Sequence, residues 1–257
     1  MKRTSKPGCI VATLTITLLI FTQQSCTIKE SDNTISSPDK KISVHFRLSD
    51  DMKAYYDIYF SDSLVIQNSR LGIIMENEDF SEKLVLKSVS PEETVIDEYE
   101  ILSSKKRICS YKGNKKVFHL KNNNGNEMDI IFQVSDGGVA FRYFFPGKSN
   151  NIKKITNETS SFNFRNGTKA FIQPMSAAKS GWCQVNPSYE EHYIQDVELS
   201  EVPVNEPGWV FPALFKYYDF WMLITETAPD RNYCGCRLKQ DSASNEFLIG
   251  FPREPEI

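Results

Sequence analysis

The stretch from Lys41 to Phe60, "KISVHFRLSDDMKAYYDIYF", contains two runs in which apolar and polar residues alternate, separated by a polar break. The apolar residues are Ile42, Val44, Phe46 and Leu48 in the first run, and Ala54, Tyr56, Ile58 and Phe60 in the second. Because successive side chains of a β-strand point to opposite faces, this alternation predicts strands with one buried face. Two such strands joined by a short polar break predict an antiparallel hairpin.

Short apolar or alternating runs continue along the chain and are separated by residues that favour turns. Clear examples are "EMDIIFQVS" at 127–135 and "VAFRYFF" at 139–145, with turn residues at 122–126 and 136–138. No segment keeps the apolar period of a helix over three turns. The sequence therefore predicts an all-β fold: an antiparallel sandwich with long loops and little helix, forming one domain over residues 41–252.

The first residues have the pattern of a signal peptide, because Lys2, Arg3 and Lys6 precede an apolar run over residues 9–21. This run is shorter than the roughly 20 apolar residues that a membrane-spanning helix needs. We therefore expect residues 1–25 to be removed on export. Their removal takes away three positive charges and no negative ones, so the formal net charge falls from −3 to −6.

Cys26 follows a small residue, Ser25, directly after the apolar run, which is the arrangement that lipoprotein processing requires. We expect a diacylglyceryl group on the Cys26 thiol and a polar tether over residues 26–40. The protein would then be exported to the periplasm or outer membrane of a Gram-negative bacterium and would touch the membrane only through this lipid. The alternative is an ordinary secreted protein in which the cysteine is coincidental.

Composition gives little support to nucleic-acid or zinc binding. No block of basic residues stands out, so we expect no nucleic-acid partner. Zinc sites usually need two spaced Cys/His pairs, which this chain does not offer clearly. The remaining cysteines could form one or two disulfides or stay as free thiols, and spacing alone does not decide between these alternatives. They are Cys109, Cys183, Cys234 and Cys236.

Three blocks of sequence, in this order, resemble the N-terminal domain of glycoside hydrolase family 97, a family of α-glucosidases and α-galactosidases. The blocks span Ser37–Ile73, "MDIIFQVSDGGVAFRYFFP" at Met128–Pro146, and "GWVFPALF…MLITETAPDRNYCGCRL" at Gly208–Leu238. The resemblance covers residues 41–252. It implies a β-supersandwich like that of galactose mutarotase, with two large antiparallel sheets packed face to face.

In the family this domain precedes a (β/α)₈ barrel that carries the catalytic carboxylates. The resemblance therefore implies that residues 253–257 begin a linker to such a barrel, which would be the main partner of the domain. It also implies an α-linked oligosaccharide as substrate of the complete enzyme. We assign no catalytic residue to this chain, and we expect an apolar patch on the side that faces the barrel.

Family members bind calcium in the active site, and the N-terminal domain supplies one glutamate ligand. The matching segment, "NPSYEEHY", places this metal ligand at Glu190, whereas a shift of one position would make it Glu191. Calcium takes six to eight oxygen ligands, so one carboxylate cannot hold the ion alone. We therefore expect calcium only in the complete enzyme.

The tryptophans admit two interpretations, core packing or stacking against a sugar. Trp221, within "FWMLI", is expected in the core. Trp182 and Trp209 follow glycines in loop-like contexts. For these two, both a position in the core and a position at the rim of a pocket are consistent with the sequence. The glycosylation-like triplets that begin at Asn157 and Asn166 are expected to form ordinary turns.

A second function, from a different class, is consistent with the same sequence. The chain could be a stand-alone lipoprotein of the cell surface that binds carbohydrate or a partner protein without catalysis.

Overall fold

A computed structural model of the chain describes residues 33–176, 192–227, 233–240 and 245–252. Within these residues the protein is built from antiparallel strands, and the helical structure is a single 3-10 turn at Leu199–Glu201. No helix in this part of the chain is long and apolar enough to span a bilayer. The prediction of an all-β antiparallel fold with little helix is confirmed.

The first sheet has four strands in the order β1-β2-β3-β4. The predicted hairpin is its centre, since Ile42 pairs with Phe60 and Leu48 with Ala54. The buried face of the hairpin is the predicted one, because Val44, Phe46 and Tyr56 are buried. The strands are β1 (Thr34–Ser36), β2 (Ile42–Leu48), β3 (Ala54–Phe60) and β4 (Ser63–Leu71).

The second sheet has five strands around the long strand β8. One edge of β8 pairs with β9. The other edge pairs with β7 along its first half and with β6 along its last residues. Asn122–Asn126 and Asp136–Gly137 form the predicted turns on either side of β9. The strands are β6 (Val85–Val89), β7 (Glu93–Glu100), β8 (Ile108–Lys121), β9 (Glu127–Ser135) and β10 (Gly138–Phe144).

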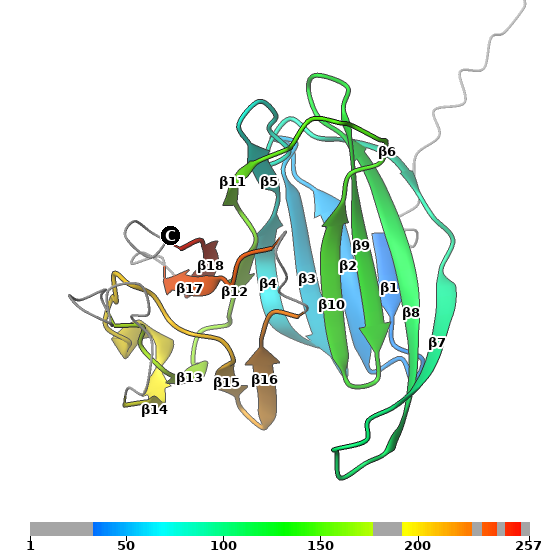
Figure 1. Cartoon of the computed structure of the whole chain (residues 1–257). Coiled ribbons are helices and arrows are strands. Elements are labelled where there is room, and N and C mark those ends of the chain that lie inside the picture. Colours follow the sequence, from blue (N-terminus) through cyan, green and yellow to red (C-terminus); the bar gives the residue numbers. More distant parts are fainter. Residues whose placement is uncertain (1–32, 177–191, 228–232, 241–244, 253–257) are drawn as a thin grey trace, which may run out of the picture.

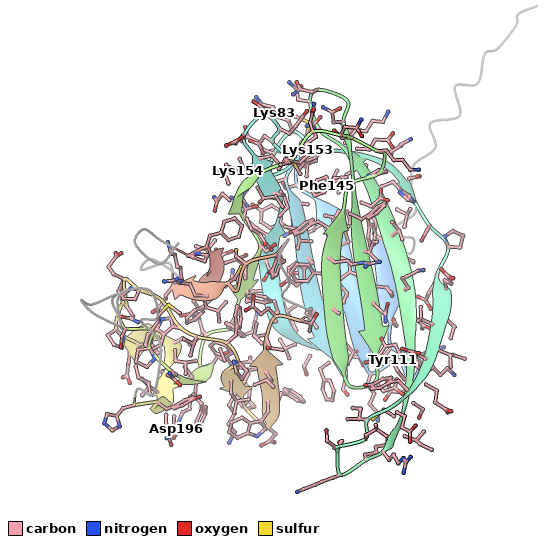
Figure 2. The ribbon with its side chains drawn as sticks, viewed as in Figure 1. Lys83, Tyr111, Phe145, Lys153, Lys154 and Asp196 are labelled. Carbon is pink, nitrogen blue, oxygen red and sulfur yellow. The ribbon has the colours of Figure 1, made fainter. Side chains whose placement is uncertain are left out.

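These two sheets lie face to face as two layers (Figure 1), and side chains fill the space between them (Figure 2). Phe46 of β2 lies 4.2 Å from Phe118 of β8, measured between ring centroids. Tyr56 of β3 lies 5.9 Å from Phe132 and 5.7 Å from Phe141. Burial of such large apolar surfaces is the main force that holds two sheets together. This pair of sheets is the sandwich that the resemblance implied.

The remaining strands form three smaller sheets, most of them in a lobe beside the sandwich (Figure 1). The lobe has its own aromatic core, in which Phe164 stacks on Phe215 at 4.1 Å and both contact Phe247. The sheets are β5 (Ile73–Met75) with β11 (Ile155–Glu158); β12 (Ser161–Asn163), β18 (Glu246–Gly250) and β17 (Arg237–Gln240); and β14 (Ile194–Glu198), β13 (Lys169–Ile172), β15 (Ala213–Tyr217) and β16 (Phe220–Ile224).

Strand β12 connects the lobe to the sandwich. The backbone N–H of Arg70 in β4 donates to Ser161 Oγ at 2.7 Å, and the N–H of Asn163 donates to Ser69 Oγ at 2.9 Å. The hydroxyl of Tyr56 donates to the carbonyl oxygen of Ser161 at 2.8 Å. These hydrogen bonds place the lobe against the edge strand β4.

The structure corrects several expectations. Trp221 was expected in the core but is 53% exposed on β16, because it lies on the outer face of its sheet. Trp209 is buried, so the core interpretation holds for it and the pocket rim does not. The triplet at Asn157 lies in strand β11 and is not a turn. The sheet begins at β1, within the residues 26–40 that the sequence assigned to a tether, and Ile35 there is fully buried.

Candidate functional site

The two site residues that the sequence predicts, Glu190 and Cys26, lie outside the described residues, and so do Glu191, Trp182 and Cys183. Their surroundings therefore stay predictions. Among the described residues, no group of three or more His, Cys, Asp or Glu side chains is arranged to hold a metal ion. Cys109, Cys234 and Cys236 are free thiols, which favours the free-thiol alternative for these three cysteines.

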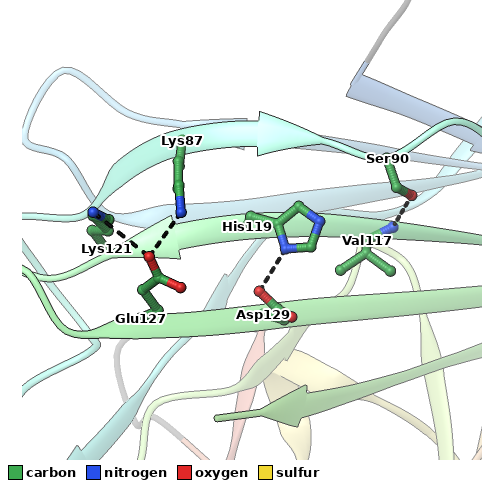
Figure 3. A network of polar contacts seen from close by, with 7 residues as sticks. All are labelled: Lys87, Ser90, Val117, His119, Lys121, Glu127 and Asp129. Atoms are coloured by element: carbon green, nitrogen blue, oxygen red, sulfur yellow. Dashed lines mark hydrogen bonds and ion pairs between the residues drawn. The ribbon is translucent and has the colours of Figure 1, made fainter. Parts of the chain in front are cut away.

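A His–Asp pair lies on the second sheet, where His119 Nδ1 is 2.7 Å from Asp129 Oδ1 (Figure 3). Such a pair forms part of hydrolase triads, and Ser88 stands opposite His119 in the register of β6 and β8. The hydrogen bonds of the described residues include none between the Ser88 hydroxyl and the imidazole. The neighbouring Lys87–Glu127 ion pair, at 2.8 Å, is also cross-strand. We interpret the His119–Asp129 and Lys87–Glu127 pairs as cross-strand polar pairing on a sheet surface and assign them no catalytic role.

Glu158, at the end of β11, is a buried acid whose pKa is raised. Its side chain is buried, and burial raises its pKa above the ordinary value for glutamate. A hydrogen bond from Ser160 lowers this pKa, and the nearby carboxylate of Glu226 raises it further. The Ser160 hydroxyl also lies 2.6 Å from that of Tyr143, which in turn accepts the backbone N–H of Gly72 at 2.8 Å. Glu158 is therefore held within the seam between the sandwich and the lobe.

Glu226 approaches the same seam from the segment after β16. Its Oε2 accepts the backbone N–H of Cys236 at 2.9 Å, which ties that segment to the start of β17. Burial raises the pKa of Glu226 as well, while this hydrogen bond lowers it. Burial raises the pKa of the Cys236 thiol to about 12, so the thiol stays protonated and unreactive at neutral pH. Burial also raises the pKa of Tyr233, whose hydroxyl lies 3.6 Å from Cys236 Sγ.

Glu158, Glu226, Tyr233 and Cys236 form what we call the acid cluster. Neither carboxylate forms an ion pair with a basic side chain among the described residues, so burying their charge is not compensated. A carboxyl group with a raised pKa suits a general acid, but glycoside hydrolysis needs two of them on either side of a bound sugar. The cluster lies in a packed seam and its acids serve backbone and hydroxyl partners. Local sequence does not indicate this cluster, because "ITNETSS" at 155–161 is typical of a polar turn.

The sheet of β14, β13, β15 and β16 is apolar on both faces. Its inner face packs into the lobe through Ala170, Ile172 and Phe215. On its outer face the register aligns Phe171 with Leu214 and Leu223, and Lys169 with Lys216 and Trp221.

Of these outer residues, Leu223 is 60% exposed. The Trp221 ring lies 5.1 Å from that of Phe171 and carries the Lys216 ammonium 4.9 Å from its centre. Lys169 forms an ion pair with Asp196, at the outer edge of the lobe in Figure 2. We call this surface the outer face.

A family model described as "Glycosyl-hydrolase 97 N-terminal" matches residues 35–252 of the chain. The chain is 25% identical over 253 residues to a protein of Streptomyces bingchenggensis (strain BCW-1) named "Probable retaining alpha-galactosidase". That match covers 97% of this chain and 37% of the relative.

Two solved structures share the fold. A beta-arabinopyranosidase has a TM-score of 0.80 and 31% identity, over 86% of this chain and 36% of its own. A Glycoside Hydrolase Family 97 enzyme from Pseudoalteromonas sp. strain K8, in complex with panose, has a TM-score of 0.70 and 21% identity, over 84% and 31%. The chain thus spans about a third of the length of these relatives. Since the family model covers nearly all of the described fold, the chain belongs to glycoside hydrolase family 97, and its residues 35–252 are the N-terminal domain of that family.

Proposed function

We propose that this chain is the N-terminal accessory domain of a calcium-dependent α-glycosidase and that it has no hydrolytic activity by itself. The observation that carries the proposal is the family match over residues 35–252, in a chain that spans about a third of its relatives. The catalytic carboxylates would then belong to a barrel domain that occupies the rest of the relatives' length. The substrate would be an α-glucoside or an α-galactoside.

Calcium enters this proposal through Glu190. Calcium takes six to eight oxygen ligands, so we propose that this chain supplies one carboxylate and the barrel supplies the others. When bound, the ion supplies positive charge beside the sugar. In that site Glu190 would contribute one carboxylate oxygen toward holding the ion.

The outer face fits a contact with the barrel. Its apolar rows are open to water in the described chain, and covering them would bury Leu223, Trp221 and Phe171. The ammonium group of Lys216 lies over the Trp221 ring and would suit an acidic group on the partner. The remaining two thirds of a family enzyme provide an occupant of sufficient size.

The acid cluster supports a structural role and not a catalytic one. Its two acids close the seam between the sandwich and the lobe, and Glu226 fixes the backbone of Cys236. Such a seam stabilises the position of the lobe relative to the sandwich at the cost of burying carboxyl groups.

We also propose that the protein is exported and is anchored through a lipid on Cys26, on the strength of the sequence pattern alone. Replacing Cys26 by alanine should move the protein from the membrane fraction to the soluble periplasmic fraction, because no thiol remains for lipid attachment. Fractionation with an antibody, together with labelling by radioactive palmitate, measures this. A Cys26→Ala protein that stays in the membrane fraction would contradict the proposal.

Hydrolysis of aryl α-glucosides and α-galactosides by this chain should be at background.

In the enzyme completed by its barrel, Glu190→Gln should weaken calcium binding at least about tenfold, because one charged ligand is lost. Calcium affinity, measured by competition with a chelating dye, reports this independently of turnover. Glu191→Gln is the matched comparison and should bind calcium like the unchanged enzyme, whereas a loss of binding in this variant alone would assign the ligand to Glu191. Turnover by the chain alone that a chelator abolishes would refute the division of labour.

Leu223→Lys should change the free energy of unfolding of this chain by less than about 0.5 kcal/mol, because the side chain is exposed. In the complete enzyme the same change should lower the thermal midpoint, because the barrel would bury an unpaired ammonium group. Ile96→Lys, at an exposed position on β7, is the control and should have little effect in either protein. Equal midpoints for the Leu223→Lys and unchanged enzymes would rule out this face as the contact.

The pair Glu158 and Glu226 should make the domain less stable as pH rises. Because the folded pKa of Glu158 is raised, the folded state holds the proton more tightly than the unfolded state, and stability is lost as pH rises through the folded pKa. Glu158→Gln keeps the size and the partner Ser160, so the free energy of unfolding gained by this change should be larger at pH 7.5 than at pH 4.5, which is the ordinary pKa of glutamate.

Urea unfolding at the two pH values measures this difference, and the exposed Glu98→Gln serves as the control. Hydrogen bonds lower the pKa of other carboxyl groups, such as Asp39, whose pKa is about 2. Asp39 therefore stays ionised throughout this range. An equal gain at both pH values would show that Glu158 is not the group responsible.

A further inference from the structure

A cavity of about 440 Å³ opens between two hairpin turns of the chain. One is the turn between β3 and β4, which contributes Ser63, and the other is the turn between β15 and β16. Arg165, from the loop after β12, completes the wall. The volume lies within the range of small-molecule sites, which is about 300–1,000 Å³.

Aromatic residues dominate one wall of this cavity. The sequence of the second turn is "YYDFW" at 217–221, and Tyr217, Tyr218 and Phe220 line the cavity. Tyr218 is 77% exposed, and its ring meets that of Tyr217 edge to face at 4.7 Å. Phe220 is held from behind by Phe60 at 5.1 Å. The wall thus combines two supported rings with one ring that is open to solvent.

The exposed ring stands on a strained backbone. Tyr218 has φ of 49°, in the left-handed region that a bulky side chain adopts at a cost. Glycine or asparagine would form this turn more easily. Strain of this kind is concentrated at functional positions, so the turn presents a tyrosine where turn chemistry favours another residue.

The opposite side of the cavity is polar. The Arg165 guanidinium donates to Gln67 Oε1 at 2.9 Å, which fixes its plane and leaves further N–H groups to donate. Asp219 brings an acceptor from the turn. One positive and one negative group together favour a ligand that is neutral and rich in hydroxyl groups.

We propose that this cavity binds one sugar unit of a neutral oligosaccharide. The C–H groups of one sugar face would lie on the Tyr218 ring, and the hydroxyls would accept from Arg165 and donate to Asp219. This inference concerns binding and does not depend on the proposed hydrolytic function, on calcium or on a barrel.

Titration calorimetry of this chain in the presence of a chelator tests the proposal. The probes are panose, raffinose and L-arabinose, which represent the α-glucosides, α-galactosides and pentoses of the related enzymes. At least one should bind with a dissociation constant of about 1 mM or tighter. Tyr218→Asn, which removes the ring and suits the left-handed backbone, should weaken binding at least about tenfold without lowering the thermal midpoint. Arg165→Lys, which removes the planar fork, should also weaken it.

Tyr99→Ala, at another exposed tyrosine, is the matched control and should bind like the unchanged chain. The proposal is overturned if none of the three probes binds, or if both Tyr218→Asn and Arg165→Lys bind as the unchanged chain does. Failure of the hydrolysis tests would leave the binding result intact, so the two proposals fail separately.

Discussion

The structure depends on the aromatic packing between the two large sheets. Phe46 against Phe118, and Tyr56 against Phe132, bring β2 and β3 of one sheet over β8 and β9 of the other. The alternation of each strand leaves one way to place these rings, because a shift of register by one residue would turn them to water. The alternation of apolar and polar residues in the sequence thus produces two layers with an apolar interior between them.

Tyr56 extends this constraint beyond the sandwich. Its ring belongs to the core, while its hydroxyl donates to the carbonyl oxygen of Ser161 in β12. Since β12 leads into Phe164, the core of the lobe is positioned from the core of the sandwich. The turn of β15 and β16 therefore comes to lie beside the turn of β3 and β4, and the cavity between them follows from the packing of two cores.

The hairpin of β2 and β3 was predictable, because its register follows from a pattern that local sequence contains. The acid cluster was not. Glu158 is buried because strands distant in sequence close over it, and Glu226 reaches Cys236 across ten positions. No periodicity reports such contacts. The prediction of Glu190 as a metal ligand came from resemblance to a family, which carries residue roles that neither alternation nor composition can supply.

The error on Trp221 has a physical explanation of its own. A continuous apolar run such as "FWMLI" is typical of a strand that is buried on both faces. In the described chain, Met222 and Ile224 pack toward the lobe core, while Trp221 and Leu223 point outward. The neighbouring strands repeat this pattern, with Phe171 and Leu214 in the same outward row. The expectation of a core position was therefore wrong for Trp221, because in the described residues only one face of this sheet packs against the lobe core.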